Sequence, residues 1–303
     1  MNNADRVKAL AEELGYTACG ITSVEPFVEF ERAVRDRMKR FPEAAHLYER
    51  LLKRADPTAT APWARSIVVC VRRYGKYRLP NGLASHVGRD YLVDSRSEYC
   101  PDHAMPRRMK EGLVGLGMRV RKGGVPDRWA GARAGVTRFG RNGFAYSKHG
   151  SWINLETWRV DAELTPDEPT LDLPCPENCD ACMRACPTGA IVAPYVMRMD
   201  RCVAYLTYGA PEPIDPALWK RMGPWIYGCD TCQLVCPLNR GKWEEIEDAP
   251  WLKEAAPHLT PEALSTMDEA AYRDIVHPRF WYIPPEDIAR WHRNAARALN
   301  SGP

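Results

Sequence analysis

The sequence has no apolar run that approaches the roughly 20 residues needed to cross a bilayer, so we expect no membrane-spanning helix. The amino terminus, M-N-N-A-D-R, carries neither a basic segment followed by an apolar one nor a twin-arginine signal. We therefore expect a protein that is not exported and not membrane-bound. The expected compartment is the cytoplasm, where thiols stay reduced.

The chain also lacks a G-x-G-x-x-G run between a strand and a helix, so nothing indicates a nicotinamide or flavin bound by a Rossmann unit. The formal net charge of +3 is small, and it neither demands nor excludes a polyanionic partner. With 303 residues, 45% of them hydrophobic and 27% charged, the composition is that of an ordinary globular protein of two or three domains.

Cysteine, in contrast, is concentrated in one stretch, because eight of the 11 cysteines lie between Cys175 and Cys236. The stretch reads C-P-E-N-C-D-A-C-M-R-A-C-P, then Cys202, then G-C-D-T-C-Q-L-V-C-P. This is the pattern of a two-cluster ferredoxin, in which the remote fourth cysteine of each run ligates the other 4Fe-4S cluster. The predicted ligand sets are Cys175, Cys179, Cys182 and Cys236 for one cluster, and Cys202, Cys229, Cys232 and Cys186 for the other.

Both runs depart from the most regular form of the pattern. Three residues separate Cys175 from Cys179, and a long insertion separates Cys202 from Cys229. Pairs of the C-x2-C type also suit tetrahedral zinc, so a pair of zinc knots is the main alternative. Zinc sites rarely repeat a C-x2-C-x3-C-P run, however, and disulfides do not fit a reducing compartment, so the iron-sulfur interpretation is favoured.

The periodicity of apolar residues predicts both helices and strands. Amphipathic helices are expected over 4–14, 26–40 and 104–116, and strands over 17–22, 66–71, 118–120, 143–146 and 152–160. Short helices are expected in the tail over 251–256, 261–264, 268–275 and 285–299. Because no regular βαβ repeat appears, the pattern favours an α+β fold.

The cysteines divide the chain into three parts. We predict a first domain over 1–168, a two-cluster ferredoxin-like module over 169–242, and a carboxyl-terminal helical segment over 243–303 that covers the module. Two clusters in one module pass single electrons, and the first part is long enough to form a domain that holds their acceptor.

Several segments resemble one enzyme family. P-T-G-A-I, R-C-V-A-Y-L-T and G-P-W-I-Y-G-C-D-T-C-Q-L-V-C-P-L-N are similar to stretches of epoxyqueuosine reductases, the cobalamin-dependent iron-sulfur enzymes that complete queuosine in tRNA. The likeness continues in A-R-S-I-V-V-C-V, G-R-D-Y, R-A-G-V-T-R-F-G-R-N, G-S-W and R-N-A-A-R-A-L-N, so it covers nearly the whole chain. The cysteine module alone is shared more broadly, with reductive dehalogenases among others.

The resemblance implies a cofactor and partners that the spacing alone does not give. A corrinoid, cobalamin, is expected between a first domain of α/β type and the cluster module. Electrons are expected to pass from an external donor of ferredoxin or flavodoxin type to the clusters, then to cobalt and to the substrate. The resemblance also implies tRNA as a partner, and cofactor-binding residues within the matching motifs, namely Arg138, Asn142, Trp152 and Gln233.

The catalytic acid of that family is the main departure. Counting back without a gap from the run 133–142, the position of the family's aspartate holds Arg121. Arginine stays charged and is a poor proton donor, so we expect Arg121 to bind an anionic group of the substrate. Asp127 could supply the acid only if the alignment shifts.

The segment F-A-Y-S-K-H-G-S-W offers other catalytic candidates. The dehalogenase resemblance suggests Tyr146 as proton donor, assisted by Lys148, and His149 is a further candidate, although the same residues also suit a strand and a solvated turn. Three functions stay open. They are epoxyqueuosine reduction on tRNA, a dehalogenase-like corrinoid-dependent reduction of another small molecule, and an electron-transfer or corrinoid-activating role.

Overall fold

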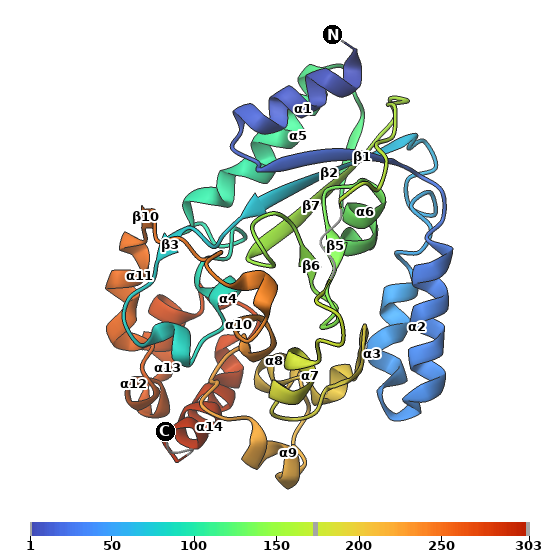
Figure 1. Cartoon of the computed structure of the whole chain (residues 1–303). Coiled ribbons are helices and arrows are strands. Elements are labelled where there is room, and N and C mark those ends of the chain that lie inside the picture. The colour runs from blue at the N-terminus through green and yellow to red at the C-terminus, as the bar shows by residue number, and fades with distance from the viewer. Residues whose placement is uncertain (1, 172–174, 301–303) are drawn as a thin grey trace.

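A four-stranded antiparallel sheet forms the centre of the first domain (Figure 1). The computed structural model describes residues 2–171 and 175–300. The strand order is β1 (Ala18–Ser23), β2 (Ser66–Arg73), β7 (Ile153–Val160) and β4 (Val120–Lys122). Strand β2 is buried along almost its whole length, as its unbroken apolar run predicts, because β1 and β7 flank it and helices cover both faces.

Alternate side chains of the sheet enter two separate cores, as the two-residue period of a strand requires. On one face, Val68 and Trp158 pack with α1 (Asn3–Glu13) and α5 (Met105–Gly115). On the other face, Ile67 and Val69 pack with three helices, α2 (Val28–Arg40), α3 (Ala45–Leu52) and α6 (Asp127–Arg133). The first domain is therefore a sheet between two helical layers.

The cysteine module consists of short elements below this sheet in Figure 1. They are α7 (Ala181–Ala185), β8 (Ile191–Ala193), β9 (Val196–Met197), α8 (Val203–Tyr208), α9 (Pro216–Arg221) and α10 (Thr231–Leu234). A two-stranded ribbon of the first domain, β5 (Arg138–Phe139) and β6 (Ala145–Tyr146), points from the sheet towards the module (Figure 1). This ribbon carries two of the predicted site residues.

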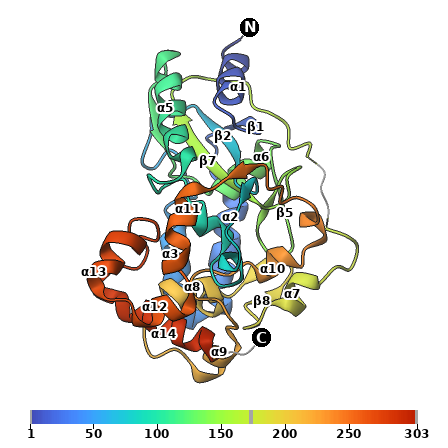
Figure 2. The ribbon, with the colours of Figure 1, turned by 90° about the vertical axis from the view of Figure 1, so that its left-hand side faces the viewer.

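The tail forms helices at the end of the molecule opposite α1 and α5 (Figures 1 and 2). They are α11 (Pro250–Ala255), α12 (Pro261–Thr266), α13 (Glu269–Ala271) with a π-helical turn over Tyr272–Val276, and α14 (Ile288–Leu299). Just before them, β10 (Glu247–Asp248) pairs in parallel with β3 (Tyr77–Arg78) of the first domain.

The tail covers more than the cysteine module. The rings of Trp291 on α14 and Tyr227 of the module stack with centroids 5.0 Å apart. The same core contains Tyr77, Leu83 and other side chains from the long loops of the first domain, among which lies α4 (Arg89–Leu92). The tail therefore joins the module to the first domain, and the boundaries at 168 and 242 stay predictions.

The mixed helices and antiparallel strands confirm the α+β fold class. Within 2–171 and 175–300, none of the helices has the length and apolar character that crossing a membrane requires.

Candidate iron-sulfur and cofactor site

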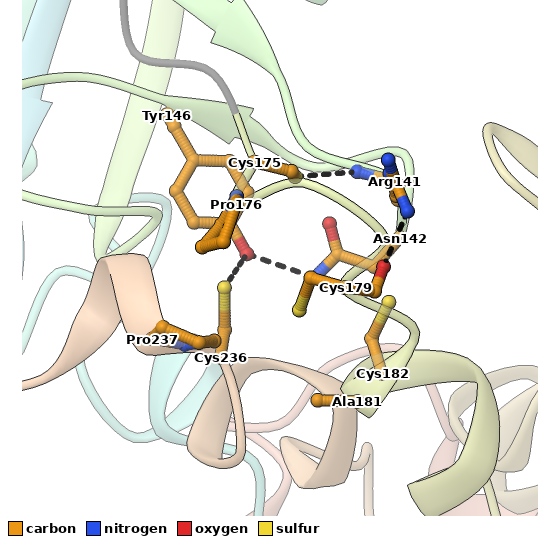
Figure 3. A pocket seen from close by; sticks show the side chains of 10 residues that line it. All are labelled: Arg141, Asn142, Tyr146, Cys175, Pro176, Cys179, Ala181, Cys182, Cys236 and Pro237. Carbon is orange, nitrogen blue, oxygen red and sulfur yellow. Dashed lines mark hydrogen bonds between the residues drawn. The ribbon is translucent and has the colours of Figure 1, made fainter.

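Four cysteines from distant parts of the module surround one space. Cys175, Cys179 and Cys182 come from the first run and its helix α7, and Cys236 follows α10 (Figure 3). They line an open space of about 280 Å³ together with Arg141, Asn142 and Tyr146 of the first domain. This is the set that the spacing predicts for one cluster, including the remote fourth cysteine.

The second predicted set also gathers in one region. Burial raises the pKa of Cys232 well above its ordinary value, and the neighbouring thiolates of Cys202, Cys229 and Cys186 raise it further. The backbone N–H of Ala190 donates to the Cys186 sulfur at 3.2 Å. Buried thiolates near one another are unfavourable unless a metal compensates their charge, which is the condition of an iron-sulfur ligand set.

The donor set at this open space is the one that a four-iron cluster takes, because four cysteines line it, Cys175, Cys179, Cys182 and Cys236. Within the described ranges, no set of three or more histidine, cysteine, aspartate or glutamate side chains is arranged to hold a single metal ion.

The loop between β5 and β6 attaches the first domain to this space (Figure 3). The backbone N–H of Arg141 donates to the Cys175 sulfur at 3.4 Å, and its guanidinium donates to the Cys179 carbonyl at 2.7 Å. The Tyr146 hydroxyl donates to the Cys236 sulfur at 3.1 Å and accepts from Asn142 Nδ2 at 2.9 Å. The loop thus contacts cysteines from both ends of the predicted set.

Tyr146 is therefore placed at a predicted cluster ligand. It is 1% exposed, and burial together with the adjacent Cys236 thiolate raises its pKa. Lys148 is exposed and His149 half-buried in the turn after β6, so the proposed assistance of Tyr146 by Lys148 has no counterpart among the hydrogen bonds of the tyrosine. The geometry places the hydroxyl next to a predicted cluster ligand, and proton donation to a substrate stays a prediction.

The other predicted cofactor-binding residues differ in exposure. Asn142, Trp152 and Gln233 are 4%, 2% and 2% exposed, whereas Arg138 is exposed on β5. Gln233 accepts from the Ser151 hydroxyl at 3.0 Å, and the Trp152 ring lies under the Arg89 guanidinium at 5.2 Å. The bond between Gln233 and Ser151 thus joins the cysteine module to the first domain, and Trp152 packs beside Arg89 near the same boundary.

Arg121 lies on the edge strand β4, opposite Arg159 of β7. Its side chain is exposed and donates to the Thr60 carbonyl. Burial and the like charge of Arg121 lower the pKa of Arg159. The contact with Thr60 gives Arg121 a structural role at the sheet edge, and its expected role in binding an anionic group of the substrate stays a prediction.

Two charged residues of the first domain, Arg128 on α6 and Asp90 on α4, were not among the predicted site residues. The Arg128 side chain is exposed but has many protein atoms around it, which lowers its pKa, while the carboxylates of Asp127 and Asp90 and the thiolate of Cys232 raise it. Burial raises the pKa of Asp90, although Asn154 donates to its carboxylate at 2.8 Å. The charges of Asp90, Arg128 and Cys232 are therefore near enough to affect one another. The motif G-R-D-Y, which contains Asp90, was the available signal.

The same motif fixes α4 to the second cysteine run. The Arg89 backbone N–H donates to the Asp230 carboxylate at 2.8 Å, and the two side chains pair at 3.7 Å. Burial raises the pKa of Asp230 to about 6, against the opposing effect of Arg89. Gly88 lies so close to Cys229 that an added Cβ would be 3.2 Å from its backbone nitrogen, so a larger residue would crowd this contact.

Comparison with known proteins gives a family. Residues 175–239 match the family described as "4Fe-4S double cluster binding domain". An epoxyqueuosine reductase of Alicycliphilus denitrificans is 30% identical over 98% of this chain and 86% of its own length. One of Staphylococcus aureus is 30% identical over 78% of this chain and 65% of its own length.

Solved structures agree on the fold. The epoxyqueuosine reductase of Streptococcus thermophilus matches 99% of this chain and 82% of its own, with a TM-score of 0.80 at 22% identity. The enzyme of Bacillus subtilis matches 98% of this chain and 81% of its own, with a TM-score of 0.77 at 23% identity. Together with the 30% identity to the Alicycliphilus protein across 86% of that protein, these matches show that the chain belongs to the epoxyqueuosine reductase family.

Proposed function

We propose that this protein reduces epoxyqueuosine in tRNA, as an oxidoreductase that uses two 4Fe-4S clusters and cobalamin. The observation that carries the proposal is the similarity to an epoxyqueuosine reductase over 98% of the chain. A structure of a related enzyme contains a tRNA stem loop modified with epoxyqueuosine, which supports tRNA as the partner here. A ferredoxin or flavodoxin type of donor and a cytoplasmic location belong to the same proposal.

The eight cysteines between Cys175 and Cys236 hold the clusters in this proposal. Cys175, Cys179, Cys182 and Cys236 already line one space, which supports the crossed ligand sets. When bound, the clusters supply one-electron transfer and cobalamin supplies the reducing metal.

The corrinoid is proposed to lie beside Arg128, in the region between α4, α6 and α10. Its amide side chains and phosphate need hydrogen-bonding and cationic partners, and Arg128, Asp127 and Asp90 supply both kinds. Arg128 also donates to the Gly143 carbonyl at 2.8 Å, so its guanidinium is held in place.

Asp90 is our proposed proton donor in place of the acid that Arg121 replaces. Burial keeps its pKa above the ordinary value of 3.8, which favours the protonated form that a general acid needs. Asp127 is less suited, because its carboxylate accepts from the Thr157 hydroxyl at 2.7 Å and lies 3.9 Å from the Arg54 guanidinium.

The proposal is tested with anaerobically purified protein reconstituted with iron, sulfide and cobalamin. We expect about eight irons and about one cobalt per chain, and a cobalt(II) EPR signal. The loaded protein should then convert epoxyqueuosine to queuosine in tRNA from a deficient strain, followed by mass spectrometry of the nucleosides. Loaded protein that leaves the tRNA unchanged with a strong reductant would refute the substrate, and iron without cobalt would leave an electron carrier.

A further inference from the structure

The hydroxyl of Tyr146 is directed at one predicted cluster ligand. Its oxygen lies 3.1 Å from the Cys236 sulfur, and the side chain is 1% exposed (Figure 3). Asn142 Nδ2 donates to the same oxygen at 2.9 Å. Because that bond uses the oxygen as acceptor, the hydrogen of the hydroxyl remains available, and the sulfur is placed to accept it.

Ser151 also lies beside the Tyr146 hydroxyl, and its side chain lowers the pKa of the tyrosine. The Ser151 hydroxyl accepts from Asn239 Nδ2 at 2.9 Å and donates to the Gln233 side chain at 3.0 Å. Asn142 is fixed, because its oxygen accepts from the Phe144 backbone N–H at 3.2 Å, which turns its nitrogen towards the tyrosine. The amide of Asn142 therefore donates to the phenolic oxygen and leaves the hydroxyl hydrogen available to the cysteine sulfur.

The backbone at residue 140 is shaped to admit this arrangement. A Cβ added to Gly140 would lie 2.3 Å from Tyr146 Cε2 and 2.9 Å from Asn142 Oδ1. Both distances are shorter than real contacts allow, so a larger residue would displace the ring and the amide. The absence of a side chain at Gly140 is thus needed for the bond to Cys236.

We propose that Tyr146 is a positioning residue that raises the reduction potential of the cluster held by Cys236. One electron added to a cluster places negative charge partly on the cysteine sulfurs, and a hydroxyl hydrogen bond stabilises that charge. No bond to the tyrosine breaks, its proton stays on oxygen, and the electron comes from an external one-electron donor. The inference rests on the cluster ligands of the proposed function and needs no particular substrate.

The test compares reconstituted wild-type protein with Tyr146→Phe, which keeps the ring and removes the hydroxyl. In redox titrations monitored by EPR, we expect the midpoint potential of one cluster to become more negative and that of the other to stay unchanged. In deuterated buffer, we expect the wild type to show a deuteron coupled to that reduced cluster and the variant to lose it. Tyr99→Phe, at an exposed tyrosine, should change neither potential.

Unchanged midpoint potentials in fully loaded Tyr146→Phe would overturn the inference, and a loss of turnover in that case would point to proton donation by the tyrosine. If the phenylalanine variant does not load iron, Asn142→Ala keeps the hydroxyl but removes the group that orients it. A smaller shift in the same direction supports the inference, and no shift overturns it. A wild-type protein that binds no iron would instead refute the proposed function, on which this inference rests.

Discussion

Burial makes several of the predicted cysteine ligands hard to ionise unless a metal compensates the charge of the thiolate. Burial raises the pKa of Cys229 to about 12, so its thiolate is disfavoured without a metal at neutral pH. The pKa of the Cys182 thiol is raised by burial and then by the nearby Cys236 thiolate. Single residues of the two predicted sets are therefore expected to decide whether a cluster is held.

Replacing the remote ligand tests the crossed sets most directly. We expect Cys236→Ser to reduce the iron content from about eight to about four per chain, because one cluster loses its fourth thiolate. Iron and sulfide analysis after reconstitution measures this. Cys100→Ser, at a buried cysteine outside the two sets, should retain all the iron. An unchanged iron content in Cys236→Ser would contradict the ligand assignment.

The proposed acid predicts a pH dependence. Asp90 must be protonated to donate, so activity is expected to be highest below its raised pKa and to fall as the pH rises through that value. Asp90→Asn should lower kcat by about 10²–10⁴-fold and remove this decline. The pH profile of kcat measures both effects, and Asp274→Asn at an exposed position is the control. A variant that keeps the decline would exclude Asp90 as its cause.

At the scale of elements, α14 holds the cysteine module through side chains that bind backbone carbonyls. Asn294 is fully buried, and its Nδ2 donates to the carbonyls of Thr207 and Ile226 at 2.8 and 2.9 Å. Arg297 donates to the carbonyls of Gly223 and Trp225. One helix of the tail therefore satisfies several buried groups of the module.

Removing the amide of Asn294 should destabilise the protein strongly. Each buried carbonyl left without a partner costs about 1–3 kcal/mol, so we expect Asn294→Ala, which leaves two of them, to lower the free energy of unfolding by about 2–6 kcal/mol. Denaturant unfolding measures the difference. The matched control is Asn300→Ala, at the exposed end of the same helix, where about 0.5 kcal/mol or less is expected. Equal effects at the two positions would contradict this role of Asn294.

The β5–β6 ribbon next to the predicted cluster site gives a second prediction about the stability of the protein. Gly140→Ala places a methyl group against the buried Tyr146 ring, and overpacking of this kind costs about 1–3 kcal/mol. Thermal unfolding should show a lower Tm. Gly115→Ala, at the end of α5 with open space around it, should leave Tm unchanged or raise it slightly. A Gly140→Ala protein as stable as the wild type would mean that the ring relaxes freely.

The sequence predicted what depends on local pattern. Periodic apolar residues gave α1, α2, α5, β2 and β7 close to their observed bounds. Three α-helices of the first domain were not predicted: α3, of eight residues, α4, of four, and α6, of seven, which are short and in which periodicity is weak. The two ligand sets could be predicted from the sequence because the spacing of the cysteines alone indicates that the fourth cysteine of each run belongs to the other cluster.

What escaped prediction depends on partners far along the chain. The Tyr146 hydroxyl meets a sulfur 90 residues away, and Arg121 meets a carbonyl 61 residues away. Neither partner can be inferred from a local motif, so the sequence alone could not show these contacts. Likewise, the effect of Asp90 on the pKa of Arg128 depends on the folded structure and cannot be read from the motif G-R-D-Y.

For the molecule as a whole, the clusters are expected to stabilise the fold as well as to carry electrons. Each cluster would join residues from both cysteine runs, so removing iron should separate the runs and expose their buried thiols. Chelation under anaerobic conditions should lower Tm, and restoring iron and sulfide should raise it again. A Tm that is the same with and without iron would show that packing by α14 alone maintains the module.

The first domain and the cysteine module are connected on two sides. Before the module, the end of the first domain is fixed to its own sheet, where the Asp167 carboxylate accepts from the Ile21 backbone N–H at 2.9 Å and pairs with Lys8. After it, β10 returns to pair with β3. Two domains that are connected at one place can move apart about that place, whereas two domains that are connected at two places separate only after one connection is broken. A cofactor between them should therefore be loaded during assembly and exchange slowly, so that its residence time, more than its affinity, sets the occupied fraction in a growing cell.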